Sequence, residues 1–376
     1  MNQGPFDGRS SARRQRGLAA VLAILVVALA ASVAIYLVWQ QTVALRQVEN
    51  LVARAQIREI ARAGTSWAAA ILSQDDSKVD HLNEPWAQPL PPIDVEQATL
   101  EGGMVDEQSK FNLNTVFTAT VPTPTGANGQ NGNTNNGTST GATGTTGDNN
   151  GQPVGQAAAA GTNNCGVDSV QVGVQVNCNA EAFKILLRQL NLDPSLCDAL
   201  IDWIDPDSNV TVPGGAEDSY YLAQDPPYRA ANQPLASVGE LRLIKGFTPQ
   251  VVDRLAPFVT ALPAQGTATA GATATTININ TVTPDMVRVF MPDVNPSIIL
   301  EARKRTPFLK ADDLLSQLPD KTKSRLQSLI DTKSNFFSAY ARVTQGRTSI
   351  TYRAILQRGS SGSQWPTILS FTEEPM

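Results

Sequence analysis

The stretch that decides the fold reads LAAVLAILVVALAASVAIYLVW and spans residues 18–39. It carries no charge, and as a helix rising about 1.5 Å per residue it is long enough to cross the roughly 30 Å hydrocarbon layer of a bilayer. Four arginines and one aspartate precede it. Because positive charges stay on the cytoplasmic side, the rest of the chain is expected on the opposite side, which in a Gram-negative bacterium is the periplasm. The sequence therefore predicts a single-pass inner-membrane protein whose C-terminal part is periplasmic.

The dipeptide Arg16-Gly17 stands directly before this apolar run. An ordinary secretory signal has a shorter apolar stretch, and its small-residue cleavage site follows that stretch. Here the candidate cleavage site comes first, which is the order found in prepilins. We therefore assign residues 1–17 to a leader and residues 18–39 to the transmembrane part of a helix, with a plain signal anchor as the alternative.

Helical periodicity continues beyond the membrane segment. Apolar residues recur at helical spacing as far as Ile71, with arginines and glutamates between them. Such a pattern is typical of an amphipathic helix. It predicts one helix from about residue 18 to 74, whose outer half carries the core-facing stripe of a folded head.

Strand patterns lie on both sides of a helical block in the rest of the chain. They cover residues 93–114 and 336–358, and the second contains a turn at Gln345-Gly346-Arg347 that predicts a β-hairpin. Short helical patterns with Asp, Pro and Gly between them occupy residues 181–204, 236–262 and 284–330. The order predicts an α+β fold, in which a pilin-like head with an antiparallel sheet is interrupted by a large inserted all-α domain of helix-hairpin-helix or SAM-like modules.

The segment boundaries follow from these patterns. Residues 122–164 are rich in Gly, Asn, Thr and Ala and almost without charge, so they are predicted to form a disordered loop. The remaining segments are the first part of the head over residues 40–121, the inserted domain over 165–332 and the C-terminal strands of the head over 333–376.

Composition argues against several classes of function. The formal net charge is -5, and the predicted leader is basic, so the remaining body is more acidic still and does not favour nucleic acid as a partner. His81 is the only histidine, which rules out His-rich zinc sites, and no constellation of residues supports an enzyme. Cys165, Cys178 and Cys197 allow one disulfide with a thiol left over, or buried free thiols, and the sequence does not choose between them.

The richest polar cluster runs from Asp202 to Tyr221 and contains five carboxylates within its first seventeen residues. Its aspartate spacing imitates the start of an EF-hand, but the glycine and the bidentate glutamate of that motif are missing. Calcium accepts six to eight hard oxygens in loose geometry, and a Gly-Gly turn would bring the later carboxylates back over the earlier ones. We therefore predict a structural Ca²⁺ site. Its candidate ligands are Asp205, Asp207, Glu217 and Asp218. Simple turn capping by the aspartates is the alternative.

Two stretches, residues 235–259 and 277–315, repeat a theme of helix, short turn and helix. In DNA-binding helix-hairpin-helix modules a glycine-rich turn presents backbone amides to phosphate, and Lys245-Gly246 would be such a turn. The same glycine also suits a helix end, and the acidic body lacks a basic stripe.

The chain resembles the minor pseudopilin K family of the type II secretion system over nearly its whole length. The resemblance rests on Arg16-Gly17 before the apolar helix and on four further motifs. They are residues 80–87 (DHLNEPWA), residues 111–114 (FNLN), the acidic stretch 202–221 with its Gly-Gly-Ala-Glu-Asp, and residues 228–234 (YRAANQP). The family resemblance implies a pilin-like head with an inserted helical domain, calcium binding, and a place at the pseudopilus tip with the minor pseudopilins I and J.

The resemblance also implies how the chain is processed and where it acts. Prepilin peptidase would cleave after Gly17 and Leu18 would be N-methylated. Most pilin-like subunits carry Glu at the fifth mature position, where this chain has Leu22. A carboxylate in hydrocarbon is costly unless it is paired, so its absence suits a subunit with no neighbour above it. We therefore expect a tip subunit that contacts the pseudopilus below it and the inner-membrane secretion platform.

Two alternative functions are also compatible with these sequence features. A minor pilin of a type IV pilus would use the same anchor, although the large insertion with Gly214-Gly215-Ala216-Glu217-Asp218 has no place in it. A membrane-tethered DNA receptor would use the helix-hairpin-helix echoes.

Overall fold

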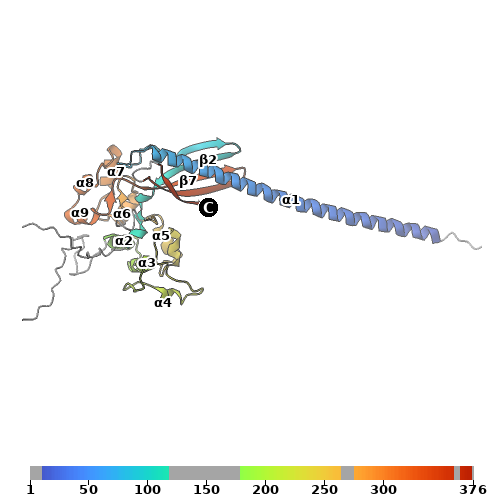
Figure 1. Ribbon diagram of the computed structural model, residues 1–376, viewed down its shortest axis with the longest axis horizontal. Coiled ribbons are helices and arrows are strands. Elements are labelled where there is room, and N and C mark those ends of the chain that lie inside the picture. Colours follow the sequence, from blue (N-terminus) through green and yellow to red (C-terminus); the bar gives the residue numbers. More distant parts are fainter. Residues whose placement is uncertain (1–10, 118–177, 264–274, 360–364, 375–376) are drawn as a thin grey trace, which may run out of the picture.

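The computed structural model describes residues 11–117, 178–263, 275–359 and 365–374, with side chains from residue 19 onward. A long helix extends away from a folded part made of a β-sheet and a group of short helices (Figure 1). The mixture of helices and an antiparallel sheet confirms the α+β class. The predicted loop at residues 122–164 and the first ten residues of the predicted leader lie outside the described residues.

The long helix, α1, runs from Ser11 to Ser73 and is 63 residues long. It ends one residue before the predicted limit and begins seven residues earlier than predicted, so Gly17 and Leu18 lie within it. Residues 19–52 of this helix are exposed within the part of the chain that the structure describes, and Leu22 is 55% exposed. Within the described residues, this is the one helix long and apolar enough to cross a membrane.

The head consists of the last part of α1 and a five-stranded antiparallel sheet. The strands, in their order across the sheet, are β1 (Leu90–Val95), β2 (Ala98–Asp106), β7 (Phe336–Gln345), β8 (Thr348–Gln357) and β9 (Thr367–Glu374). The predicted hairpin is β7 and β8, and Gly346 in its turn has φ +60°, a backbone conformation that glycine adopts without a Cβ clash. The sheet therefore joins strands from before and after the helical block.

The head core lies between α1 and one face of the sheet. Ile57 and Ala61 of α1 are fully buried against Leu100 of β2 and Val343 of β7. Along β2 and β8 buried residues alternate with more exposed ones, as expected for strands with a single covered face. The predicted core-facing stripe on the outer half of α1 is thus present.

The helical block between β2 and β7 contains two modules of the same design. Each begins and ends with a short strand, and the two strands of a module pair in parallel. The first module contains β3 (Phe111–Asn112), α2 (Cys178–Gln189), α3 (Leu196–Ile204), α4 (Asp218–Tyr221), α5 (Pro249–Leu255) and β4 (Val259–Thr260). The second contains β5 (Ile277–Asn278), α6 (Pro284–Phe290), α7 (Pro296–Arg305), α8 (Ala311–Leu315), α9 (Asp320–Leu326) and β6 (Ile330–Asp331). Short 3₁₀ helices span Pro85–Ala87, Glu107–Ser109, Leu113–Thr115 and Val238–Leu243.

One buried asparagine holds each module together in the same way. Asn114 donates to the carbonyl of Leu235 (3.0 Å) and accepts from its amide (2.8 Å). Asn280 does the same with Phe308, at 3.0 and 2.9 Å. The sequences around them, FNLNTV at residues 111–116 and ININTV at residues 277–282, are correspondingly alike. The predicted repetition of helix, turn and helix is therefore part of a larger internal repeat.

The block departs from the prediction in two respects. It is not all-α, because two pairs of short parallel strands close its modules. Phe111, which the sequence places in the first part of the head, lies in the core of the block, where its ring stacks on Phe183 at 5.7 Å. Hydrophobic burial decides this, since a two-residue strand has too little pattern to reveal which core it enters. Cys178 is disulfide-bonded and Cys197 is a buried free thiol.

Three consecutive polar residues join the head to the block where the chain leaves β2. Asp106 accepts from the hydroxyls of Ser334 (2.6 Å) and Thr281 (2.5 Å). Glu107 forms an ion pair with Arg353 of β8 (2.5 Å) and accepts from Thr260 of β4 (2.8 Å). The interacting groups are all buried or partly buried. We call the segment Asp106, Glu107 and Gln108 the joint.

Gln108 completes the joint. Its side-chain amide donates to the carbonyl of Thr276 (2.9 Å), and its carbonyl accepts from the amide of Asn335 (2.6 Å). Buried polar groups of this kind are costly to leave unpaired, so the joint favours one orientation of the block on the head.

Candidate metal centre in the acidic loop

Three of the four predicted ligands come together in the folded chain. Asp205, Asp207 and Glu217 each offer a carboxylate oxygen, and these oxygens all lie within 4.8 Å of one another. Asp205 and Glu217 are buried, whereas Asp207 is exposed. The group therefore has a protected inner side and one ligand at the solvent.

The end of α3 places the first two carboxylates. Asp205 caps the helix and is extended, with φ -71° and ψ 154°, because the following Pro206 disfavours a helical conformation for the residue before it. Asp207 then accepts a hydrogen bond from the amide of Asn209 at 2.8 Å, as an Asx turn does. One oxygen of Asp207 therefore caps a turn, as the alternative hypothesis predicts. Its other oxygen remains available to a cation.

Asp202 positions the part of the loop that turns back toward α3. It was not among the ligands predicted from the sequence. Both of its carboxylate oxygens accept from the amide of Thr211, at 3.0 and 3.1 Å. A Cβ on Gly215 would lie 2.1 Å from Asp202 Oδ2 and 2.4 Å from the carbonyl of Thr211. Only glycine fits at this position, and its small size allows the chain to pass close to α3. The chain then reaches Glu217, which is the N-cap residue of α4.

The loop is an addition to the first module. In the second module, residues 306–307 alone separate the end of α7 from Phe308, which is held by the asparagine. In the first module, residues 205–234 separate the end of α3 from its counterpart Leu235. The repeat itself does not need this segment, which is consistent with a separate role for it.

Two oxygens in the group have no partner. Asp205 Oδ1 and Glu217 Oε1 are buried and, within the described residues, accept no hydrogen bond. Burial, together with the charges of Asp207 and Asp202, raises the pKa of Asp205 to about 6. Burial and the neighbouring carboxylates of Asp202 and Asp205 likewise raise the pKa of Glu217 to about 7. Buried carboxylates without donors are costly, and a cation between them would remove that cost.

Asp218 lies apart from this group. Its Oδ2 accepts from Arg229 at 2.7 Å and its Oδ1 from the amide of Ala230 at 3.1 Å. Arg229 belongs to the YRAANQP motif, whose Tyr228 hydroxyl donates to the carbonyl of Leu243 at 2.8 Å. The motif therefore closes over the loop and engages the fourth predicted ligand.

The donor set fits a hard divalent cation. Carboxylate oxygens are the ligands that Ca²⁺ prefers, and the exposed side of the group leaves room for water or backbone carbonyls to complete six to eight ligands. No histidine or cysteine takes part, which disfavours zinc.

A second acidic group, Asp75, Asp80 and Glu84, has a different character. Arg358 Nη2 donates to Asp75 at 3.0 Å and also binds Asp80, so a guanidinium already supplies the positive charge. Glu84 accepts from the amide of His81 (2.9 Å) and from the indole of Trp86 (2.6 Å). The DHLNEPWA motif is thus a structural turn that anchors the end of α1.

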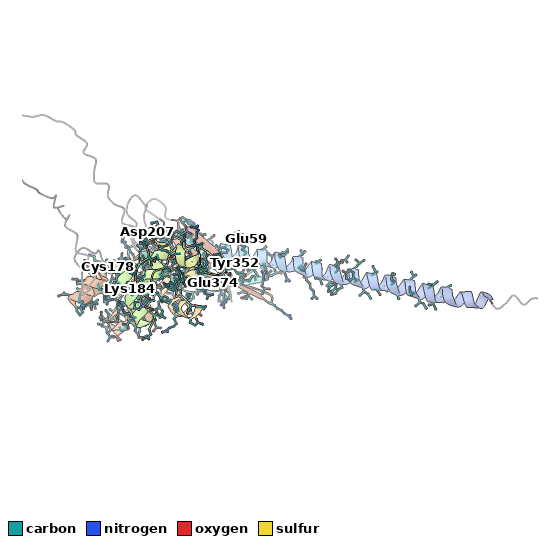
Figure 2. All side chains as sticks on the ribbon, turned by 90° about the horizontal axis from the view of Figure 1, so that it is seen from below. Glu59, Cys178, Lys184, Asp207, Tyr352 and Glu374 are labelled. Atoms are coloured by element: carbon teal, nitrogen blue, oxygen red, sulfur yellow. The ribbon has the colours of Figure 1, made fainter. Side chains whose placement is uncertain are left out.

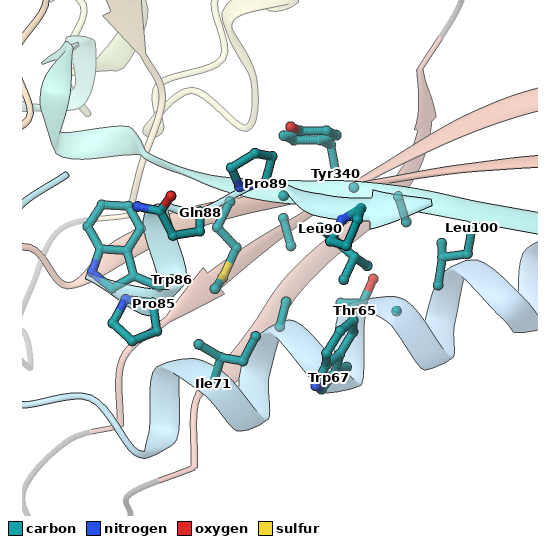
Figure 3. Close-up of a pocket in the computed structure, with 18 residues that line it drawn as sticks. Thr65, Trp67, Ile71, Pro85, Trp86, Gln88, Pro89, Leu90, Leu100 and Tyr340 are labelled. Atoms are coloured by element: carbon teal, nitrogen blue, oxygen red, sulfur yellow. The ribbon is translucent and has the colours of Figure 1, made fainter. Parts of the chain in front are cut away.

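An apolar cavity of about 180 Å³ lies between α1 and the sheet beside β1. Trp67 and Ile71 of α1, Trp86 of the 3₁₀ helix Pro85–Ala87 and Leu90 of β1 are among the residues that line it (Figure 3). The lining residues include no Asp, Glu, His, Lys, Arg or Cys, and the cavity is mainly apolar.

In the predicted phosphate-binding turn, Lys245 makes contacts within the protein itself. Lys245 Nζ donates to the carbonyl of Gly215 at 3.0 Å and lies 5.2 Å from the centre of the Tyr220 ring. Gly246 has φ +83° and follows the 3₁₀ helix Val238–Leu243. This agrees with the helix-end reading of the glycine and does not favour DNA binding.

The chain is similar to type II secretion proteins along nearly its whole length. The family model for type II secretion system protein K matches residues 109–264. The type II secretion system protein K of Aeromonas hydrophila is 27% identical, covering 93% of this chain and 95% of the relative. That of Pseudomonas aeruginosa is 28% identical, covering 93% and 91%.

A solved structure has a similar fold. It is a chain in the crystal structure of the GspK-GspI-GspJ complex from the enterotoxigenic Escherichia coli type 2 secretion system. The TM-score is 0.60 and the identity 22%, and the match covers 88% of this chain and 100% of that one.

Fold and site together define a class: a protein in which one helix, long and apolar enough to cross a membrane, is also the spine of a head, with a helical insertion that carries an acidic loop. Within that class the chain is similar to type II secretion system protein K, both in the domain at residues 109–264 and along the length of the named relatives. By their names, these relatives are proteins of a type II secretion system.

Proposed function

We propose that this chain is a minor pseudopilin that caps the pseudopilus tip with the minor pseudopilins I and J and initiates its assembly. The fibre would then grow beneath the cap and carry folded proteins toward the outer membrane. The observation that carries the proposal is α1. Its apolar residues are uncovered along most of its length, whereas its last turns are built into the head. A helix of this kind needs a bilayer or neighbouring helices.

Position at the tip is supported by Leu22. It is an exposed apolar residue where pilin-like subunits usually carry a glutamate for the subunit above. The similar fold of a chain that was crystallised with GspI and GspJ supports minor pseudopilins I and J as partners. Prepilin peptidase, the inner-membrane platform and the pseudopilus below the tip complete the proposed partners, and nucleic acid is not among them.

We also propose that the acidic loop binds Ca²⁺ as a structural ion. Asp205, Asp207 and Glu217 would hold it, and Asp218 would join them only if it released Arg229. The ion would neutralise two buried carboxylates and fix the loop on the first module.

The test uses a strain that lacks this chain. The full-length chain should restore secretion of folded proteins and should co-purify from detergent-solubilised membranes with secretion proteins I and J of the same bacterium. A variant lacking the block, residues 107–332, should still insert in the membrane but should not form the three-protein complex. Normal secretion and normal fibre length with this variant would contradict the proposed tip function.

A further inference from the structure

The two edges of the head sheet differ in whether another strand can join them. β9 forms one edge, and within the described residues it pairs only with β8. Every second backbone amide and carbonyl of an edge strand points outward and is available to an added strand. β9 contains no proline, so none of its donors is missing.

The opposite edge is blocked. β1 contains Pro91 and Pro92, which have no N–H to donate, and its pairing with β2 is irregular between Leu90 and Ile93. Prolines and bulges are devices by which proteins prevent unwanted strand addition. β9 has no proline, and its pairing with β8 is irregular only at Leu369, between the pairs Ile355–Ser370 and Leu356–Ile368. The full set of backbone donors on β9, against the two missing on β1, identifies β9 as the edge more open to a partner.

β9 also presents apolar side chains. Ile368 is 46% exposed and Leu369 is 40% exposed. Phe371 is half-buried, and its ring stacks on Tyr352 of β8 at 4.9 Å. Ile368 and Phe371 pair with or pack on residues of the α1 side of the sheet, so an added strand would find an apolar surface beside β9.

A ridge of exposed arginines on α1 lies near the same edge of the sheet. Arg54, Arg58 and Arg62 are exposed and recur every four residues, which places them along one side of the helix. The guanidinium carbon of Arg62 lies 5.8 Å from the centre of the Phe371 ring. Burial raises the pKa of Tyr352, and the charges of Arg58 and Arg54 partly oppose this rise. The ridge therefore reaches the sheet next to β9.

Acidic groups of the chain only partly neutralise the ridge. Glu59 pairs with Arg62 at 2.9 Å, and Glu373 of β9 interacts with Tyr352. Glu374 turns to the other face, where it pairs with Arg353 at 3.7 Å. Figure 2 labels Glu59 of α1, Tyr352 of β8 and Glu374 of β9. Three arginines thus face two carboxylates, and the surface keeps a positive charge.

We propose that β9 is the docking edge for an extended segment of a neighbouring subunit of the fibre, with carboxylates on the side that faces α1. Strand addition along the eight residues of β9 would form roughly eight main-chain hydrogen bonds. Its apolar residues would cover Ile368 and Phe371, and its carboxylates would meet Arg54 and Arg58. This inference rests on the proposed function, because it takes the partner to be another subunit of the same assembly.

Hydrogen exchange tests the backbone contacts. The full-length chain is measured in detergent, alone and in complex with secretion proteins I and J, with residue resolution over 367–374. Alternate amides of β9 should exchange at least tenfold more slowly in the complex, whereas amides of β1 should not change. A complex that forms without this protection would overturn the β9 inference alone. Protection that appears on self-association of the chain would also overturn it, because the occupant would be a second copy. Absence of any complex would overturn the proposed function itself.

Charge reversal tests the side-chain contacts. The double variant Arg54→Glu, Arg58→Glu should weaken the complex at least tenfold, and Arg54→Lys with Arg58→Lys should restore most of the affinity. Arg46→Glu is the matched control, because Arg46 is an exposed arginine of α1 that lies outside the head. An unchanged thermal midpoint of the isolated variant excludes misfolding. Equal affinities for the double variant and the control would contradict the inference.

Discussion

At the scale of single residues, the features that stand out are buried carboxylates and what each of them faces. Asp80 faces a guanidinium, Asp106 faces two hydroxyls, and Asp205 and Glu217 face each other across an exposed aspartate. Only the last pair has oxygens without a donor among the described residues. The same residue type therefore serves as a structural clasp in one place and as a candidate cation ligand in another.

Calcium should stabilise the chain through Asp205 and Glu217. In excess Ca²⁺ at 100 times Kd, binding adds about 2.7 kcal/mol to the free energy of unfolding, so the thermal midpoint of the detergent-solubilised chain should rise relative to EGTA. Asp205→Asn and Glu217→Gln should abolish that rise. In EGTA the same variants should be as stable as the wild type or more so, because a buried charge is removed.

Asp312→Asn is the control for this measurement, because Asp312 is an exposed carboxylate on α8. It should keep the full response to Ca²⁺. If Ca²⁺ leaves the wild-type midpoint unchanged, the acidic loop is not a calcium site.

Asp106 should make the stability depend on pH. Burial raises its pKa to about 6, and the hydrogen bonds from Ser334 and Thr281 only partly oppose this. A raised pKa means that the folded chain binds the proton more tightly than the unfolded chain, so this contribution is complete below about pH 4 and is lost as the pH rises through 6. Asp106→Asn should remove up to about 1.4 kcal/mol per pH unit from the slope of the unfolding free energy between pH 4 and 6.

Denaturant unfolding of the full-length chain in detergent, repeated across this pH range, provides the comparison. Asp80, whose pKa burial raises to about 7, remains in both proteins, and Asp106→Asn removes a neighbouring charge that also raises this pKa, so the Asp80 contribution falls in the same direction. Identical slopes for the wild type and Asp106→Asn would show that Asp106 does not titrate in this window.

At the scale of elements, the first module shows how a repeat acquires a site. Its helices and its asparagine clasp are shared with the second module, but the connection after α3 is longer and returns on itself through Gly214 and Gly215. The side chain of Asp202 in α3 accepts a hydrogen bond from the backbone amide of Thr211 in the returning loop. The placement of Glu217 next to Asp205 thus depends on a close passage of main chain over a helix.

Gly215→Ala should therefore disturb the loop. The added Cβ would meet Asp202 Oδ2 and the carbonyl of Thr211 at distances that no relaxed contact allows. The cost should be roughly 1–3 kcal/mol of unfolding free energy, together with weaker Ca²⁺ binding. Gly239→Ala is the matched control, since its Cβ would find only Ser237 Oγ at 3.6 Å. Calorimetric titration with Ca²⁺ and denaturant unfolding of both variants check this, and equal behaviour of the two would contradict it.

At the scale of the whole molecule, the chain consists of an anchor, a head and an insertion that are fastened to one another. α1 passes from its exposed apolar segment into the head core without a break, and the joint at Asp106 to Gln108 fastens the insertion to the head. The acidic loop is therefore held in a fixed relation to the anchor. Such an arrangement suits a subunit whose position in a fibre is set by its N-terminal helix.

Processing at Gly17 is a prediction about the whole chain. Mass spectrometry of the membrane-extracted protein should find a mature N-terminus at methylated Leu18. In a strain without prepilin peptidase the chain should keep Met1. An uncut Met1 in the wild-type strain, or a cut after residue 39, would contradict the prepilin route.

The sequence by itself determined the parts with strong local patterns. The apolar run and the periodicity after it specified α1, and the alternation around Gln345-Gly346-Arg347 specified the β7 and β8 hairpin. Four carboxylates in one polar loop were enough to name three members of the acidic group. These signals lie within a few turns or one hairpin, where local spacing dictates which side chains share a face.

Only the tertiary structure decided the rest, because the deciding contacts join residues far apart in the chain. Phe111 enters the insertion core rather than the head because Phe183 and Phe290 are there to bury it. Asp218 turns to Arg229, Asp202 becomes the support of the loop, and Asp106 becomes a joint because Thr281 and Ser334 meet it. Burial and pairing of polar groups depend on what the fold brings near, and no local spacing contains that information.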